Sequence, residues 1–306
     1  MQYDVIVGVS AGSFNTLCMA GYKPEDIDDS ADFTLKYWNE TATHDEFPSW
    51  DYGIMEGLLM HGGLIPIEPK VELMKERFKG KTLQKKVSFE TVDSMSGKAV
   101  VYDYNATGWF DDDFIRTVYA SMSIPFIFPP MLKDGRALID GGSTWNVDIS
   151  SAVRRCKEIV DDDKDIIVDV ILVGDGQPKQ IDDFSDYNAF KHFLRAFEIK
   201  GYTNNMDDYI SSMKMYPDVE FRYVISPSED ISSGGIISLD FSEEFVRRCF
   251  EVGFKDAENA VKLGPDVHKK LLFEYNDRVK DGEQVSFDEI VNSRLNQIDQ
   301  TYLVSL

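Results

Sequence analysis

The chain has 306 residues, 43% of them hydrophobic, and its 54 acidic and 32 basic side chains give a formal net charge of -22. This charge repels nucleic-acid phosphates and anionic lipid surfaces, so we expect no nucleic-acid partner. No apolar run approaches the roughly 20 residues of a transmembrane helix. The first residues also lack the basic segment and the longer apolar stretch of a signal peptide.

The three cysteines, Cys18, Cys156 and Cys249, are widely spaced and form no metal-ligand pattern. They indicate a reducing environment, and we expect an intracellular protein, cytoplasmic or peripheral to membranes, with no metal. No Gly/Ser-rich or Pro-rich linker and no internal repeat divides the sequence. We therefore expect residues 1–306 to form a single domain.

The first predicted element is a strand, followed at once by a tight turn and a helix. Val5–Val7 are β-branched, which is typical of a fully buried parallel strand. The next residues, Gly8-Val9-Ser10-Ala11-Gly12, have the G-x-S-x-G pattern of a nucleophile elbow. Apolar or small residues then recur at i, i+3, i+4 and i+7, as on one helix face: Phe14, Leu17, Cys18 and Gly21.

This pattern makes Ser10 the candidate nucleophile. Gly8 and Gly12 would remove side chains that collide with the strand and the helix at a strained turn. The Ala11 N–H, at the helix N-terminus, is a natural donor to an oxyanion. The alternative is a tight turn in which Ser10 only caps the helix.

The middle of the chain alternates charged segments with predicted strands. Six cations between Lys75 and Lys86 follow a helix-like segment; they suit either phosphate head groups or, as we favour, a solvated helix end. Lys86–Val92 and Lys98–Tyr104 predict two strands that form a hairpin. Asp111–Asp113 lack the spacing of a calcium loop and precede a predicted helix, so we assign no metal to them.

A proline-rich run then leads to a second candidate site residue. The apolar loop Ile124–Met131 suits either an acyl-chain groove or ordinary packing. It is followed by a short strand, Ala137–Ile139, and by Asp140-Gly141-Gly142. Asp140 thus lies at the end of a buried strand, where two glycines let the backbone turn. The alternative is that the aspartate only helps to form this turn.

The last part of the chain predicts further strands and helices. Strands are expected at Ile166–Val173 and Val219–Ile225, and helices at Phe241–Val261 and Val267–Tyr275, with Gly264-Pro265 between them. The alternation of strands and helices indicates an α/β fold. A Ser-Asp-His triad would need a histidine after Asp140. Helical periodicity directs His192 to solvent but leaves His268 near a buried edge.

The elbow and the Asp140-Gly141-Gly142 turn, with the A-S-x-x-I-P-x-x-F-P-P run from Ala120 to Pro130, resemble the patatin-like phospholipase family. The resemblance implies a three-layer α/β fold with a mostly parallel central sheet flanked by helices. It also implies a Ser-Asp dyad of Ser10 and Asp140, with Gly141 and Gly142 supporting the turn and no cofactor. The substrate would be a lipid or fatty-acyl ester, with peripheral membrane contact.

One family feature is not found among the printed residues. Patatin-like proteins carry a strand and a Gly-rich oxyanion loop before the elbow, whereas here only Met1–Val7 precede Gly8. Gly62-Gly63 is a weak substitute, and a plain turn suits it better. We therefore expect a single patatin-like domain that lacks this segment and is a weak lipid acyl hydrolase. The alternatives are an impaired homologue that binds lipid or protein, and a Ser-Asp-His esterase using His268.

Overall fold

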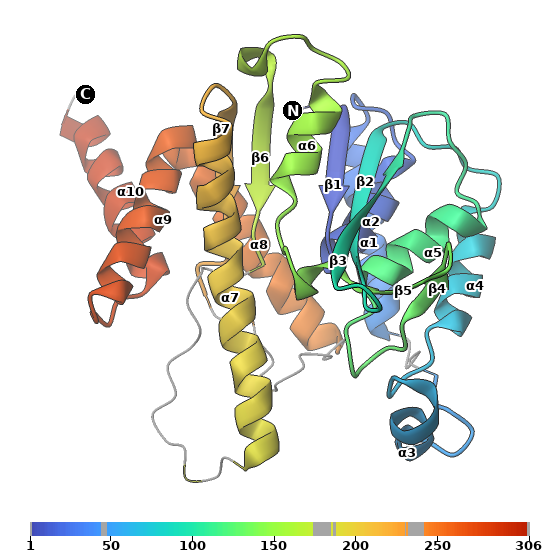
Figure 1. The fold of residues 1–306 in the computed structure, drawn as a ribbon. Helices are drawn as coiled ribbons and strands as arrows, with labels where there is room; N and C mark the ends of the chain where they lie inside the picture. Colours follow the sequence, from blue (N-terminus) through green and yellow to red (C-terminus); the bar gives the residue numbers. More distant parts are fainter. Residues whose placement is uncertain are drawn as a thin grey trace. The chain divides into compact units, whose positions relative to one another are not determined.

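The computed structural model describes residues 2–43, 48–173, 185, 188–229, 231 and 242–304. The chain divides into two compact units, Met1–Asp161 and Asp162–Leu306 (Figure 1). Each unit is described by itself. The prediction that residues 1–306 make one patatin-like domain stays a prediction.

Unit 1 alternates strands and helices, as the sequence pattern predicts. Its strands are β1 (Val5–Gly8), β2 (Lys86–Asp93), β3 (Lys98–Tyr104), β4 (Met131–Lys133) and β5 (Arg136–Asp140). Its α-helices are α1 (Ala11–Ala20), α2 (Ile27–Thr43), α3 (Ile54–Glu56), α4 (Glu68–Phe78), α5 (Asp112–Ser121) and α6 (Ile149–Cys156). A π-helical turn, Gly57–His61, continues α3, and a 3-10 turn, Gly141–Ser143, follows β5.

The five strands of unit 1 form one mixed sheet in the order β1-β2-β5-β4, with β3 on the other edge of β2. β1 runs parallel to β2, whereas β3 and β5 are antiparallel to β2 and β4 is antiparallel to β5. The predicted hairpin of β2 and β3 is confirmed, and so is the α/β class. The antiparallel pairs arise because short turns join β2 to β3 and β4 to β5, and a two-residue or four-residue turn reverses the chain.

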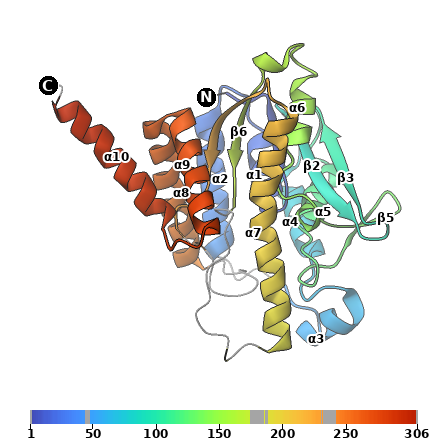
Figure 2. The same ribbon diagram turned by 60° about the vertical axis from the view of Figure 1, so that its left-hand side comes forward.

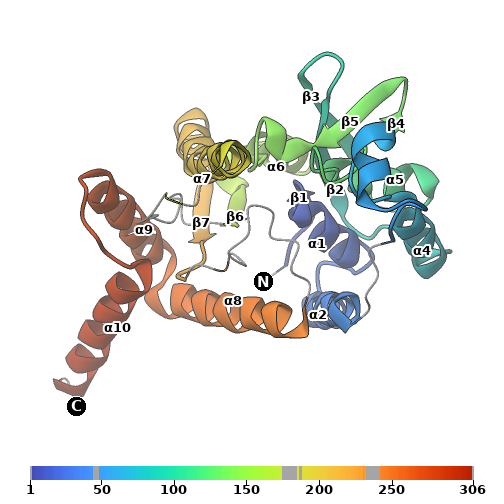
Figure 3. The ribbon, with the colours of Figure 1, turned by 90° about the horizontal axis from the view of Figure 1, so that it is seen from below.

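Helices cover the sheet of unit 1 on both faces. α1 and α6 contact β1, and they lie on opposite sides of that strand (Figure 3). The predicted apolar face of α1 is confirmed, because Phe14, Leu17 and Cys18 are all buried in the main core. Val5–Val7 differ from the prediction, since they are half-buried in an edge strand that pairs on one side only among the described residues.

Unit 2 contains β6 (Ile167–Ile171), β7 (Glu220–Ile225), α7 (Ala189–Met215), α8 (Glu243–Leu263), α9 (Pro265–Lys280) and α10 (Phe287–Val304). β6 and β7 pair in parallel, and α8, α9 and α10 follow one another as separate helices (Figure 2). α8 ends at Gly264, whose φ of 85° suits glycine, and Pro265 begins α9, two residues before the predicted start at Val267. Phe241, the first residue of the helix predicted over Phe241–Val261, lies outside the described residues.

None of the helices in the described ranges is long and apolar enough to cross a membrane. All three cysteines are free. The cellular compartment stays a prediction.

Candidate active site

Ser10 and Asp140 come together because β1 and β5 pair with the same edge of β2 and their carboxyl ends point toward each other. Gly8, the last residue of β1, pairs with Phe89 of β2. Asp140, the last residue of β5, pairs with Thr91. β3 occupies the other edge of β2 along both stretches, so β1 and β5 approach each other from opposite directions. Their carboxyl ends are separated along β2 by a single residue.

The Ser10 hydroxyl reaches the Asp140 carboxylate directly. Ser10 Oγ donates a hydrogen bond to Asp140 Oδ2 at 2.6 Å, across 130 residues of sequence. Ser10 has φ 53° and ψ -126° at the N-terminus of α1, a strained conformation that functional residues adopt when the surroundings hold them there. The structure therefore brings the predicted serine and aspartate together in one hydrogen-bonded pair.

The glycines of the elbow have different roles from those the sequence argument assigns. A Cβ on Gly8 would lie 2.4 Å from the Gly12 carbonyl oxygen, so only glycine fits at position 8, as predicted. A Cβ on Gly12 would meet no heavy atom within 4 Å, so the predicted collision at Gly12 is wrong. It is the backbone of Gly12 that lies close to Gly8. This contact would remain possible with a side chain at position 12.

Asp140 is held at the end of β5 by its backbone and by its neighbouring glycines. Its N–H donates to the Ser123 carbonyl at 2.9 Å, and the Gly142 N–H donates to its Oδ1 at 2.8 Å. A Cβ on Gly141 would lie 2.4 Å from the Glu90 carbonyl oxygen, and one on Gly142 would lie 2.6 Å from Asn146 Oδ1. Gly141 is therefore required by its close approach to the β2 backbone, whereas a side chain at Gly142 would need only the end of the Asn146 side chain to shift.

Burial sets the proton affinity of Asp140. The side chain lies in the interior, with 5% of the residue exposed, and desolvation raises its pKa to about 6 against the opposing effect of the hydrogen bonds from Ser10 and Gly142. A carboxylate with such a pKa is ionised at neutral pH and holds a proton more strongly than an exposed aspartate does. These are the properties of a general base that accepts a proton from a hydroxyl and returns it.

Ser121, at the end of α5, is a site residue that the sequence argument missed. Its Oγ accepts hydrogen bonds from the Ser10 N–H at 3.1 Å and from Ser13 Oγ at 2.8 Å. It donates to the Glu90 carbonyl at 2.6 Å. Ser121 thus fixes the backbone of the strained nucleophile position to β2. Its place in the Ala120–Pro130 run was the signal that could have found it.

The Ala11 N–H is free for a ligand. Ala11 is exposed at the first position of α1, and no hydrogen bond among the described residues occupies its N–H. The Ser10 N–H is different, because it is bonded to Ser121. Of these two amides of the elbow, only the one at Ala11 has no partner among the described hydrogen bonds, and its predicted role as an oxyanion donor stays a prediction.

The two histidines that follow Asp140 in the sequence belong to unit 2. His192 is exposed on α7, as its helical position predicts. His268 is 2% exposed in unit 2, where Nδ1 pairs with the Val224 carbonyl at 2.9 Å and the ring contacts Phe287. Burial lowers the pKa of His268. Within unit 1, Ser10 Oγ bonds Asp140 directly, with no histidine between them.

Other predicted features have structural explanations. Asp111 caps α5 through the Phe114 N–H at 2.9 Å, as its position before a helix predicts. Of the basic stretch, Lys75 pairs with Asp112, Lys86 pairs with Glu158, and Lys85 is buried. These three cations therefore interact with other parts of the protein and do not form a cluster for phosphate binding.

The predicted apolar loop Ile124–Met131 is partly buried. Ile127 and Met131 are buried, whereas Ile124 and Phe126 are more than one-third exposed.

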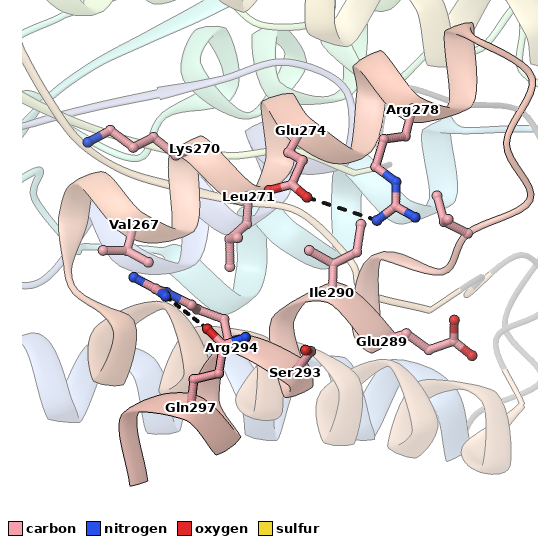
Figure 4. Close-up of a pocket in the computed structure, with 11 residues that line it drawn as sticks. Val267, Lys270, Leu271, Glu274, Arg278, Glu289, Ile290, Ser293, Arg294 and Gln297 are labelled. Carbon is pink, nitrogen blue, oxygen red and sulfur yellow. Dashed lines mark hydrogen bonds and ion pairs between the residues drawn. The ribbon is translucent and has the colours of Figure 1, made fainter. Parts of the chain in front are cut away.

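A surface pocket of about 540 Å³ lies in unit 2 between α9 and α10 (Figure 4). Two pairs of its lining side chains interact along their own helices, Glu274 with Arg278 at 3.9 Å on α9 and Arg294 with Gln297 at 2.9 Å on α10. Neither Ser10 nor Asp140 lines it. We assign this pocket no part in the site.

Comparison with known proteins identifies the family of this chain. The model of the patatin-like phospholipase family matches residues 1–153, which is half of the 306 residues and includes both Ser10 and Asp140. A search of curated proteins finds no match. The chain therefore belongs to the patatin-like phospholipase family, whose members are generally hydrolases of lipid esters.

Proposed function

We propose that this protein is a serine lipid acyl hydrolase that uses a Ser10–Asp140 dyad and forms an acyl-enzyme. The observation that carries the proposal is the 2.6 Å hydrogen bond from Ser10 Oγ to Asp140 Oδ2. Membership of the patatin-like family supports a lipid ester as the substrate. A buried, ionisable carboxylate bonded to an elbow serine is an arrangement that activates a hydroxyl nucleophile.

In the proposed mechanism, Ser10 Oγ attacks the ester carbonyl carbon while Asp140 takes its proton. The carbonyl oxygen becomes an oxyanion, and the Ala11 N–H at the N-terminus of α1 donates to it. The tetrahedral species collapses as the C–O bond to the alcohol breaks and Asp140 returns the proton to the departing oxygen. Water then attacks the acyl-enzyme with Asp140 as the base, which releases the fatty acid and restores Ser10.

Active-site labelling and ester turnover test this proposal together. A fluorophosphonate should label the full chain once, and Ser10→Ala should abolish both labelling and hydrolysis of a short soluble ester. Asp140→Asn should lower kcat by about 10²-fold or more, because the hydroxyl loses its base. Ser94→Ala, which alters an exposed serine on the β2–β3 turn, is the matched control and should leave both signals intact. Labelling that survives Ser10→Ala would contradict the proposal.

A further inference from the structure

One short segment of unit 1 exposes large apolar side chains at an unusual density. Six residues within nine consecutive positions are from 45% to 85% exposed, and we call them the apolar tip: Tyr52, Ile54, Met55, Leu58, Leu59 and Met60. The tip is formed by α3 and the π-helical turn that follows, and it projects from unit 1 beyond the sheet (Figures 1 and 2). Soluble proteins rarely expose contiguous apolar surface of this kind without a binding role.

The tip is held together by hydrogen bonds and a ring contact among residues 50–63. The Glu56 carboxylate accepts a hydrogen bond from the Tyr52 N–H at 2.8 Å and pairs with His61 Nε2 at 2.9 Å. The His61 ring stacks on Trp50, with centroids 3.9 Å apart. Trp50 Nε1 in turn donates to the Gly63 carbonyl at 3.1 Å. These four contacts form the scaffold of the tip, and the apolar side chains on it are exposed where a soluble helix usually presents polar ones.

The scaffold is attached to the segment that carries the candidate active site. The N–H groups of Leu64 and Ile65 donate to the carbonyls of Phe126 and Ile127 at 3.1 and 2.9 Å. A Cβ on Gly63 would lie 2.2 Å from the Pro129 nitrogen, so the two segments are in close contact. The same loop begins beside Ser121 and Ser123, which bond the backbones of Ser10 and Asp140. Phe126 is itself 37% exposed and adds to the apolar surface.

Charge decides what this surface can accept. No lysine or arginine occurs between Tyr37 and Pro69, so the tip has no cation on its own segment for an anionic head group. The net charge of -22 repels anionic bilayers and also repels a second copy of the chain. A zwitterionic phospholipid surface carries no net charge and accepts apolar side chains without this cost.

We propose that the apolar tip is the surface by which this protein binds zwitterionic phospholipid assemblies, next to the segment that positions Ser10 and Asp140. The inference rests on the proposed lipid hydrolase function. It goes further by naming the residues that enter the lipid and the charge class of the lipid surface.

Vesicle flotation with the full chain tests the inference. The parent carries Ser10→Ala so that no lipid is consumed, and the probe is phosphatidylcholine vesicles. Leu59→Asp/Met60→Asp should weaken binding by about tenfold or more, because two exposed apolar side chains can no longer enter the lipid. Met95→Asp/Leu132→Asp is the matched control, since its residues are 76% and 77% exposed against 75% and 76% in the tip. The control should bind within about twofold of the parent.

Several results would overturn the inference: a parent that does not float, equal weakening by both double variants, or stronger binding to phosphatidylserine than to phosphatidylcholine vesicles. Dimers that Leu59→Asp/Met60→Asp disperses, seen by sedimentation, would identify a second copy as the occupant instead.

A second measurement does not depend on how well the charged variants fold. Tyr52→Trp places a reporter at the most exposed position of the tip, at 85%. Brominated phosphatidylcholine should quench its fluorescence beyond that of the parent, and Met95→Trp should show no added quenching. Equal quenching of both reporters contradicts the inference.

The failure of this inference differs from the failure of the proposed function. The inference alone fails if Ser10-dependent hydrolysis of a soluble ester persists while vesicle binding is insensitive to the tip. The proposed function fails if no ester is hydrolysed in a Ser10-dependent manner.

Discussion

Ser10 and Gly8 show how a single backbone conformation is stabilised at the elbow. The Ser10 φ of 53° is one that L residues adopt at a cost of about 1–3 kcal/mol. The Gly8 backbone must also pass within contact of Gly12. A side chain at position 8 would push the strand and the helix apart, and the Ser10 hydroxyl would move with them.

The two elbow glycines therefore give opposite predictions. Gly8→Ala should destabilise the fold by about 1–3 kcal/mol or more, because its Cβ overlaps the Gly12 carbonyl. Gly12→Ala should be neutral or stabilise by up to about 1 kcal/mol, because its Cβ meets nothing within 4 Å and alanine favours the helix. Thermal unfolding of the two variants measures the difference. Equal destabilisation would contradict the geometry of the turn.

The titration of Asp140 predicts the pH dependence of activity. The proposed base must be ionised, and burial raises its pKa to about 6. Hydrolysis of a soluble ester should therefore rise with pH and reach half its maximum near pH 6, in measurements of kcat/KM on the free enzyme. A profile that is flat from pH 4 to pH 8 would show that another group limits the reaction.

The same titration predicts the pH dependence of stability. The folded-state pKa lies above the ordinary aspartate value of 3.8, so the contribution of Asp140 to stability is fully present below about pH 4 and is lost as the pH rises through about 6. Asp140→Asn should thus raise the free energy of unfolding at pH 8 by about 1–3 kcal/mol, and the gain should vanish near pH 4. Asp32→Asn, on the exposed face of α2, is the control. Equal gains in both variants would contradict the assignment.

At the scale of elements, the site depends on how three of them end. β1 and β5 stop on either side of Glu90 on one edge of β2. α5 ends at Ser121, whose hydroxyl joins the elbow to the Glu90 carbonyl. The relative position of Ser10 and Asp140 thus depends on β2, with which both strands pair, although no side chain of β2 bonds Ser10 or Asp140 among the described hydrogen bonds.

Replacing Ser121 tests this dependence. Ser121→Ala leaves the buried Ser10 N–H and Ser13 hydroxyl without their acceptor, so kcat on a soluble ester should fall about tenfold, with KM changed less than about twofold. Ser123→Ala is the matched control, because Ser123 is equally buried and, among the described hydrogen bonds, its hydroxyl bonds the Tyr119 carbonyl of α5 and not the elbow. It should keep kcat within about twofold. Equal losses in both variants would assign Ser121 a general packing role.

At the scale of the whole molecule, the net charge of -22 opposes folding. Self-repulsion among like charges destabilises a compact chain, and salt screens it. The temperature of unfolding should therefore rise as sodium chloride increases from about 20 to about 300 mM, since exposed ion pairs such as Arg247 with Glu251 add little to stability. A midpoint that falls with salt would show that the ion pairs outweigh the repulsion.

The local part of the site could be predicted from the sequence. Gly8 and Ser10 lie within a few residues of a β-branched run and an apolar helix face, and these patterns identify the strand, the turn and the helix. Asp140-Gly141-Gly142 identifies a turn after a strand in the same way. The hairpin of β4 and β5 was missed, although Asp134-Gly135, with φ values of 51° and 71°, is a two-residue turn signal. The helix α10 was missed as well.

The sequence by itself determined the α/β class, the elbow, the turn at Asp140 and the charge, because each depends on neighbouring residues or on composition. Only the tertiary structure decided that Ser10 and Asp140 are bonded, that Ser121 holds the elbow, that Gly12 is not sterically required and that the apolar tip faces outward. These features depend on the register of β1 and β5 on β2 and on contacts across more than 100 residues. Such contacts follow from packing in three dimensions, which local periodicity and propensity do not specify.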